Sequence, residues 1–401
     1  MNTTNTEKNL TLSYSMIQSF FWMNFAAIMG FSSIYLLSCG ITNTQIGMII
    51  AAAGIISAIL QPVVASYADR PSSASLRRIV AVICLIILSV NACILLLYHR
   101  SVVLTGLLYG CSITLLQLML PLVNSLGTES MNQGRKLNWG IARGMGSLVY
   151  AIIAYLLGII VENTTARSVP VSIVIGFILM FVSVVTFPFR KTSSDAAAAP
   201  EKTGSSGSGS PAAFFRKYRR FSMVLSGTTL VYISHILLNN FTFQIVQSKG
   251  GGSPEMGFSM ALAACIELPT LFLFSRMVKK VRCDIWFRLC GIFFALKAIG
   301  TLLAPNIPGF YGVQFLQMLG WALMTVASVY YVNAIMEKED AIKGQAYMTM
   351  TYTFGSVLGA LIGGWLIDAA GVNAMLIFAS ACAVIGAVIM LILSEKTPQN
   401  G

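Results

Sequence analysis

The chain of 401 residues is 56% hydrophobic and only 10% charged, and its formal net charge is +12. Soluble proteins carry about a quarter charged residues, so this composition excludes a soluble globular domain and is typical of a polytopic helical membrane protein. The positive charge does not indicate a nucleic-acid partner, because Lys and Arg lie in short segments between apolar runs, as membrane topology requires.

Twelve apolar stretches are long enough to cross a hydrocarbon layer of about 30 Å as α-helices. We predict spans at residues 12–37, 45–68, 79–98, 102–126, 138–160, 169–189, 222–247, 256–275, 285–304, 309–335, 344–368 and 373–394. No charge lies between Lys8 and Asp69, but the polar turn at 39–45 divides that stretch into two helices. The expected fold is an all-α integral membrane protein of twelve transmembrane helices.

The distribution of Lys and Arg predicts the orientation of these spans. If Arg288 at the start of span 285–304 is counted with the preceding loop, the termini and the even-numbered loops hold 21 of the 26 basic residues. The odd-numbered loops hold three, Arg100, Arg167 and Lys249, and the remaining two, Arg143 and Lys297, lie inside spans. Because short cytoplasmic loops carry the excess of Lys and Arg, both termini are expected in the cytoplasm. The predicted partner is a lipid bilayer, and the predicted location is the plasma membrane.

One long connection divides the spans into two sets of six. Residues 190–220 contain the tract AAAAPEKTGSSGSGSP, whose Ser and Gly content predicts a flexible cytoplasmic linker. We therefore predict a six-helix bundle at 1–189 and a second one at 221–401.

The two halves also look like copies of each other. Pro62 and Pro269 are 207 positions apart, and Gly146 and Gly355 are 209 apart in similar surroundings. Parallel repeats with a site between them at the membrane midplane are typical of secondary transporters. Glycines four residues apart further predict close helix packing, at Gly355, Gly359 and Gly363 and at Gly140 and Gly144.

A single carboxylate lies deep in a predicted span. Glu267 is the only charge between Met256 and Ser275, about 13–16 Å from either surface. A charge at that depth costs on the order of 2.5–3.5 kcal/mol to insert, and such residues mark functional sites. We interpret the rest of the chain as a scaffold that hides, pairs and alternately exposes Glu267.

With these features the sequence resembles the major facilitator superfamily, and within it the oligosaccharide:proton symporter branch typified by lactose permease. The resemblance extends over essentially the whole chain and implies a secondary transporter made of two pseudo-symmetric six-helix bundles. The stretches that carry it are FFWM (20–23), IYLLSCGITNTQIGMI (34–49), QPVVASYADR (61–70), NWGIARGMGSLVYA (138–151) and EDAIKGQAYMTMTYTFGSVLGALIGGWLIDAAGV (339–372).

The loop after the second helix matches the superfamily's signature of a Gly, an Asp four residues on, and basic residues. Ala65 takes the place of the Gly. Asp69 and Arg70 match the signature, and Arg77 and Arg78 supply its basic end. The resemblance implies that Asp69, Arg70 and Arg77 form a charge latch that gates the cytoplasmic side. A helix-end cap with solvated charges is the alternative.

The resemblance also implies a solute-binding site. Lactose permease has a sugar-contacting arginine on its fifth helix, in an Arg-x-x-Gly pattern followed by an aromatic ring, and Arg143, Gly146 and Tyr150 occupy those positions. A guanidinium fork suits vicinal hydroxyls or a carboxylate; an arginine that snorkels to the nearby surface is the alternative. The family's sugar-binding carboxylate matches Glu267 and its buried arginine falls on Lys297, so a Glu267–Lys297 pair is expected, with a purely structural pair as the alternative.

Several positions depart from the family pattern. The His/Glu couple on the tenth helix is absent, and those positions read Gly320 and Leu323. The acid that pairs with the helix 5 arginine falls on Asn124 or Ser125, while Glu129 matches a second acid one turn on and joins the predicted gate. We expect Asn124 to contact the solute.

The seventh helix lacks the family's aspartates and carries His235, Asn239 and Asn240 nearby. We predict solute contacts for these three, with a hydrogen-bonded packing histidine as the alternative. Glu267 is left as the one carboxylate deep in a span, and it is the predicted proton-coupling residue.

The primary hypothesis is a monomeric symporter that couples proton entry to uptake of a small polar solute, a sugar or glycoside, by alternating access. The proton is the coupling ion, and no other cofactor or metal is expected. A nucleoside or aromatic-acid symporter and an uncoupled uniporter of the same fold stay open as alternatives. Drug efflux is disfavoured because residues 141–160 lack the proline of the exporters' helix 5 signature. A receptor needs a folded soluble domain and an enzyme needs a nucleophile beside a base, and the sequence indicates neither.

Overall fold

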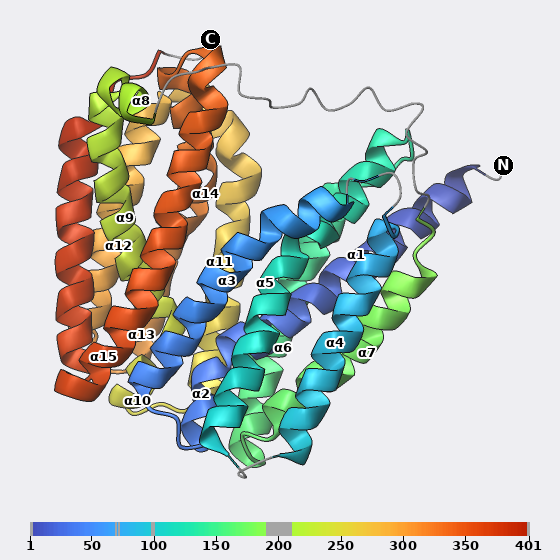
Figure 1. The fold of residues 1–401 in the computed structure, drawn as a ribbon. Coiled ribbons are helices and arrows are strands. Elements are labelled where there is room, and N and C mark those ends of the chain that lie inside the picture. Colours follow the sequence, from blue (N-terminus) through green and yellow to red (C-terminus); the bar gives the residue numbers. More distant parts are fainter. Residues whose placement is uncertain (1–2, 69, 71–72, 98–100, 190–210, 399–401) are drawn as a thin grey trace. The chain divides into compact units, whose positions relative to one another are not determined.

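The computed structural model describes residues 3–68, 70, 73–97, 101–189 and 211–398, without the side chains of 3–9, 271–272 and 275. Within these ranges every regular element is a helix (Figure 1). The elements are α1 (Thr3–Phe25), η1 (Ala26–Gly30), α2 (Ser32–Ser38), α3 (Asn43–Ala68), α4 (Leu76–Leu96), α5 (Val102–Asn132), α6 (Trp139–Asn163), α7 (Ser168–Thr186), α8 (Pro211–Lys217), α9 (Arg219–Asn240), α10 (Thr242–Ser248), α11 (Ser253–Lys280), α12 (Cys283–Leu303), α13 (Ile307–Gln314), η2 (Phe315–Met318), α14 (Trp321–Ile335) and α15 (Lys338–Leu393).

Nine helices of the described chain are long and apolar enough to cross a membrane, or up to ten if the bent pair Leu10–Gly30 and Ser32–Ser38 is one span. The longest, α15, merges two helices across Gly371, whose backbone is not helical (φ 82°, ψ 173°). Its two parts cover the expected spans 344–368 and 373–394. The all-helical prediction is confirmed, while the number of twelve crossings stays a prediction.

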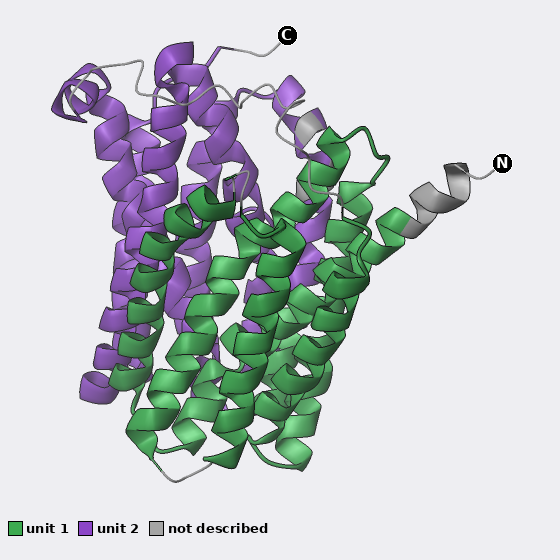
Figure 2. Ribbon diagram, turned by 45° about the vertical axis from the view of Figure 1, so that its right-hand side comes forward, with its two compact units in different colours: residues 1–202, 253–261 green, residues 203–252, 262–401 purple. Residues whose placement is uncertain are grey.

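The chain divides into two compact units, coloured separately in Figure 2. Unit 1 comprises Met1–Lys202 and Ser253–Ala261, and unit 2 comprises Thr203–Gly252 and Leu262–Gly401. The beginning of α11 is therefore counted with unit 1 and the remainder of that helix with unit 2.

The start of α11 belongs to unit 1 because it packs backbone-to-backbone on α6. A Cβ added to Gly257 would lie 2.3 Å from the carbonyl oxygen of Ala154, so only glycine permits this approach. The backbone N–H of Ser253 donates to a carboxylate oxygen of Glu162 at 3.4 Å.

The expected flexible linker, 190–220, is helical where the structure describes it. Residues 190–210 lie outside the described residues, but α8 and the first turn of α9 occupy the rest. Phe214 is buried, with ring centroids 5.0 Å from both Tyr218 and Tyr347. This burial of an aromatic ring explains why the end of the segment is ordered.

The first span of each unit has the same break, which supports the predicted repeat. The helix is interrupted at Phe31 (φ −101°, ψ 10°) in unit 1 and at Phe241 (φ −111°, ψ 27°) in unit 2, 210 positions later. Each break is followed by a helix of seven residues, and then by a glycine at φ 82°, Gly40 or Gly250. A left-handed backbone favours glycine at both positions.

Close packing through glycines is confirmed in unit 2. A Cβ on Gly355 would lie 2.6 Å from the Cβ of Tyr232, and one on Gly363 would lie 2.5 Å from Cδ2 of Leu237. Between them, a Cβ on Gly359 would lie 3.0 Å from the carbonyl oxygen of Ile233, also on α9. This stripe lets α9 and α15 approach each other closely.

The second expected stripe makes no close contact within unit 1. A Cβ on Gly140 would meet only the Asn138 side chain at 3.6 Å, and one on Gly144 would meet no described atom within 4 Å. The close contact on α6 is made instead by Gly146, where a Cβ would lie 2.6 Å from Cδ1 of Trp22. Spacing alone did not indicate which glycines of this helix face a neighbour.

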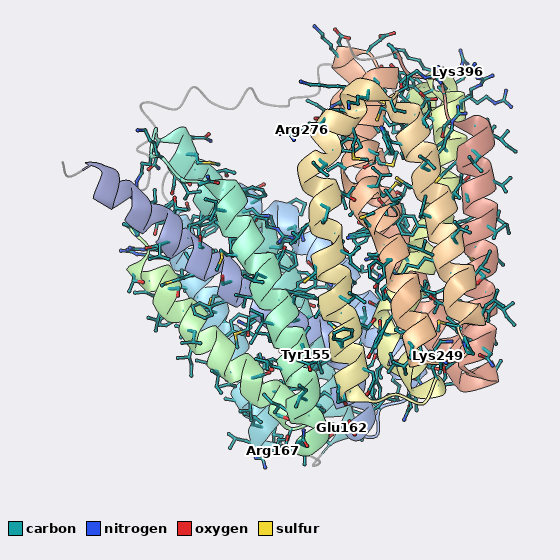
Figure 3. All side chains as sticks on the ribbon, turned by 180° about the vertical axis from the view of Figure 1, so that it is seen from behind. Tyr155, Glu162, Arg167, Lys249, Arg276 and Lys396 are labelled. Atoms are coloured by element: carbon teal, nitrogen blue, oxygen red, sulfur yellow. The ribbon has the colours of Figure 1, made fainter. Side chains whose placement is uncertain are left out.

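Three basic residues from the loops and the C-terminal end of unit 2 lie at its two ends, as the loop pattern requires. Arg276 and Lys396, from segments predicted to be cytoplasmic, lie at one end, and Lys249, from a loop predicted to be external, lies at the other (Figure 3). The assignment of either end to the cytoplasm stays a prediction.

Candidate solute-binding site

In unit 1 the central charged group is Arg143, which lies half-buried on α6. Its guanidinium carbon is 4.0 Å from the ring centroid of Trp22 on α1, and Nη1 donates to Oγ of Ser147 at 2.7 Å. Stacking of this kind contributes about 0.5–2 kcal/mol. Gly146 makes the contact possible because it lets Trp22 lie against the α6 backbone.

An amide network extends from the same indole. Nε1 of Trp22 donates to Oε1 of Gln18 at 3.2 Å, and Nε2 of Gln18 donates to Oδ1 of Asn124 at 3.3 Å. Tyr150 meets Trp22 edge-on, with ring centroids 6.4 Å apart. The structure thus gathers three predicted residues, Arg143, Tyr150 and Asn124, around Trp22 and Gln18. We call these five residues the unit 1 cluster.

In unit 2 the two predicted charges are joined through a third residue. Lys297 is 3% exposed and its ammonium donates to Oε1 of Gln317. Nε2 of Gln317 donates to Oε1 of Glu267 at 2.9 Å. The expected Glu267–Lys297 pair is therefore a bridge of three residues, one each from α11, η2 and α12, and we call it the unit 2 bridge.

The backbone that carries Gln317 is irregular in the middle of an apolar span. α13 passes into the 3-10 segment η2, and Gly320 (φ −87°, ψ −90°) precedes the start of α14. Non-helical backbone inside a membrane is tolerated only where protein or a polar cavity surrounds it. The positions at which the family carries its His/Glu couple fall on this break, at Gly320, and on Leu323, which is buried.

His235 lies in an aromatic cluster of unit 2. Its ring stacks on Trp321 with centroids 4.3 Å apart and planes at 10°, and Phe294 meets it edge-on at 5.3 Å. Asn239 donates to the ring nitrogen Nε2 at 2.9 Å, and Asn240 lies half-buried at the end of α9. These contacts favour the packing interpretation of His235, while solute contacts of the three residues stay predictions.

The structure describes three of the four residues of the predicted gate. Asp69 lies outside the described residues, Arg70 is exposed, and Glu129 is half-buried on α5. Arg77 donates to the carbonyl oxygen of Phe187 at 3.1 Å, which caps the end of α7. For Arg77 the geometry matches the alternative of a helix-end cap, and the charge latch stays a prediction.

Four residues of these clusters were not singled out from the sequence, namely Gln18, Trp22, Gln317 and Trp321. Gln18 and Gln317 carried one usable signal, since an amide in a long apolar run needs a polar partner. Trp22 was part of the FFWM stretch but had no assigned role. Nothing in the sequence pairs Trp321 with His235, which lies 86 positions earlier.

Comparisons with known proteins agree over the whole chain. The model of the MFS_1 like family matches residues 11–379. A maltose permease of Geobacillus stearothermophilus is 22% identical over 387 residues, which is 94% of this chain and 93% of the permease.

Solved structures show the same fold at low identity. The nucleoside transporter NupG matches with a TM-score of 0.80 at 14% identity, over 97% of this chain and all of that one. A D-xylose-proton symporter matches with a TM-score of 0.67 at 13% identity, over 97% of this chain and 98% of its own. The chain belongs to the MFS_1 like family and is a multi-pass membrane transporter of the major facilitator superfamily.

Proposed function

We propose that the protein is a symporter that couples proton entry to uptake of a small polar solute, a sugar or glycoside, across the plasma membrane. The observation that carries this proposal is the unit 2 bridge, which places a titratable carboxylate inside a membrane span with both an amide and an ammonium for support. The likeness to a maltose permease over nearly the whole chain supports a sugar as the solute.

The proposed transport cycle uses both clusters. Glu267 takes a proton on the outer side, and the solute binds there to the unit 1 cluster, in which Arg143 offers paired N–H donors to its hydroxyls. Alternating access then exposes the bound solute to the cytoplasm, as in other transporters built from repeats. Loss of the proton from Glu267 on the inner side releases the solute.

The proposed arrangement has twelve spans and cytoplasmic termini, and the protein acts as a monomer. Asp69, Arg70, Arg77 and Glu129 gate the cytoplasmic side in this scheme. The 21 basic residues in the termini and even-numbered loops support the orientation.

The test is uptake of radiolabelled maltose into liposomes that contain the purified protein, driven by an acid exterior. Glu267→Gln is expected to abolish accumulation against a gradient while exchange between two filled compartments continues, because exchange needs no net proton movement. Glu255→Gln, in the first turn of the same helix, is the matched control and is expected to accumulate maltose normally. Undiminished accumulation by Glu267→Gln rejects the proposal. Downhill flux in the native protein without any response to pH favours the uniporter instead.

A nucleoside is the second candidate solute. Trp321 and Tyr352 form a tilted ring pair with centroids 5.6 Å apart, and Tyr352 is 38% exposed, so an aromatic face is available to a base. The fold shared with NupG is compatible with this solute. A thermal-shift screen with maltose, uridine and an aromatic acid separates the candidates, since only the bound solute raises the melting temperature.

A further inference from the structure

Gln317 stands between the two charges of unit 2, and nothing in the resemblance to lactose permease assigns it a role. It is 5% exposed and is the only described residue that bonds to both Lys297 and Glu267. Its carbonyl oxygen faces the ammonium and its NH2 group faces the carboxylate. An ammonium has three donors and no acceptor, so the Lys297 contact must be made by the oxygen of the amide.

This chemistry leaves the amide one orientation. With the oxygen held by Lys297, the NH2 group is obliged to point toward Glu267. An NH2 group donates well to an ionised carboxylate, but it offers no acceptor to the O–H of a protonated one. Hydrogen bonds to a charged acceptor are worth about twice those between neutral groups.

We propose that Gln317 is a positioning residue for the proton step at Glu267: Lys297 fixes the orientation of the Gln317 amide, and the oriented amide favours the ionised carboxylate. This inference rests on the proposed function, because it assumes that Glu267 takes and loses a proton. It adds that the charge of Lys297 acts on Glu267 through an intervening amide as well as through space.

The location of Gln317 links the proton step to the backbone. When Glu267 is protonated, the bond from Gln317 to α11 weakens, while the bond to Lys297 on α12 persists. Gln317 lies in η2, next to the break at Gly320, and short 3-10 segments inside helices often mark hinges. Protonation thus loosens α11 from the interrupted span at its irregular point.

Other titratable groups of unit 2 lie around the same break. His235 of α9 stacks on Trp321 just past the break, and Tyr352 of α15 tilts against the same indole. Tyr232 of α9 meets Tyr352 edge-on at 5.3 Å. Tyr232 and Tyr352 make ring contacts with each other and with Trp321, and His235 contacts Trp321. The residues bonded to Gln317 are Lys297 and Glu267.

The test measures protonation of Glu267 directly and needs no solute. The full-length protein in lipid is titrated by infrared difference spectroscopy of the carboxylic-acid C=O band, which is assigned by its loss in Glu267→Gln. Gln317→Met removes the donor at similar volume and is expected to raise the pH at which Glu267 takes its proton by about one unit. Gln314→Met is the matched control, because Gln314 is also 5% exposed and lies three positions earlier in the same span. This substitution is expected to leave the pH at which Glu267 takes its proton unchanged.

A double-mutant cycle separates orientation by Lys297 from simple donation. In a Lys297→Met background the amide is free to turn and accept the O–H of Glu267, so the effect of Gln317→Met is expected to fall to less than half of its value in the native background. Equal shifts in the two backgrounds overturn the proposal, as does an unchanged or lowered titration point in Gln317→Met. If Gln317→Met does not fold, Gln317→Glu takes its place, since it accepts from Lys297 but has no NH2 group to donate. An unchanged titration in that variant also overturns the proposal.

The two failures are distinguishable. If native protein shows no proton-driven uptake, the proposed function fails whatever the infrared titration gives. If uptake is proton-driven and the cycle is additive, Glu267 remains the coupling residue and only the role of Gln317 is lost.

Discussion

Unit 1 holds the cluster around Arg143 and unit 2 holds the bridge of Glu267, Gln317 and Lys297, and the two groups are built from different chemistry. In unit 1 the charge is that of Arg143, which stays protonated at every accessible pH, and its neighbours are an indole and amides. In unit 2 the charged residues are Glu267 and Lys297, an acid and a base, and an amide connects them.

The difference suggests a division of tasks within the proposed transport cycle. A permanent cation held flat on a ring presents the same donors in every state, which suits recognition of a solute. A bridged acid and base change their hydrogen bonds when one proton arrives, which suits switching. Substitutions in unit 1 are therefore expected to alter binding at every pH, and substitutions in unit 2 to alter the response to pH.

The largest effect is expected at Arg143. Arg143→Ala removes charge-assisted hydrogen bonds worth about 1.5–3 kcal/mol each, so maltose uptake is expected to fall about 100-fold or more. Arg143→Lys keeps the charge without the planar fork and is expected to lose about tenfold. Both losses are expected in exchange as well as in pH-driven uptake, measured in liposomes. Normal exchange by Arg143→Ala contradicts the division of tasks.

A smaller effect is expected when the ring under that arginine is removed. Trp22→Ala loses a stacking contact of about 0.5–2 kcal/mol, which corresponds to a maltose affinity weaker by about 2- to 30-fold. Trp22→Phe retains a ring and is expected to lose less. Affinity is measured by binding of radiolabelled maltose to the purified protein. Trp365→Ala is the control, because Trp365 is 58% exposed on α15 and is expected to change nothing.

The histidine of unit 2 tests whether a titratable ring is needed beside the bridge. His235→Phe keeps the stack on Trp321, so uptake is expected to remain within about threefold of native, with an unchanged pH profile. His235→Ala loses the ring contacts and is expected to lower the free energy of unfolding by about 0.5–1.5 kcal/mol. A displaced pH profile in His235→Phe would instead support the proton or solute contact predicted from the sequence.

The smallest effect is expected at polar contacts between helix ends, outside the apolar runs. Lys217 of unit 2 lies 2.8 Å from Asp340, in the first turn of α15, and 2.7 Å from Glu337. The hydrogen bond from Lys217 holds the pKa of Asp340 below its ordinary value of 3.8. Stability from this contact is therefore present above pH 3.8 and is lost as the pH falls through the lowered pKa.

The corresponding contact in unit 1 contains no titrating acceptor, because Arg77 donates to the carbonyl oxygen of Phe187. Lys217→Met is expected to lower the melting temperature slightly at neutral pH, since the groups are largely exposed, and the deficit is expected to vanish in acid. Arg77→Met is expected to give a deficit that does not change over the same pH range. Melting curves from about pH 7 to about pH 3 compare the two, and a pH-independent deficit in Lys217→Met contradicts the ion-pair account.

Several features were predictable because they depend on local composition. Long apolar runs placed the helices, and the depth of Glu267 in one of them marked it as a charge that needs support. Lys297 and Arg143 were recognised in the same way, as lone charges within spans. The repeat was predicted from the separations of 207 and 209 positions between matching prolines and glycines. In the structure, the helix breaks at Phe31 and Phe241 are separated by 210 positions.

Other predictions failed or were incomplete because they depended on neighbours. The stripe of Gly140 and Gly144 has the same spacing as the one on α15, yet α1 approaches α6 at Gly146 instead. The Ser/Gly tract suggested flexibility up to residue 220, but Phe214 is buried against the rings of Tyr218 and Tyr347. Spacing and composition describe one helix at a time, whereas packing depends on which helix lies opposite.

The sequence by itself determined the class of this protein, the positions of its membrane helices and the three charges inside them, because hydropathy and charge are properties of each segment alone. Only the tertiary structure decided what those charges touch. Trp22 lies under Arg143, and Gln317 lies between Lys297 and Glu267, because separate helices cross at those points. The crossings depend on side-chain shapes that meet across long stretches of chain, and no single segment contains that information.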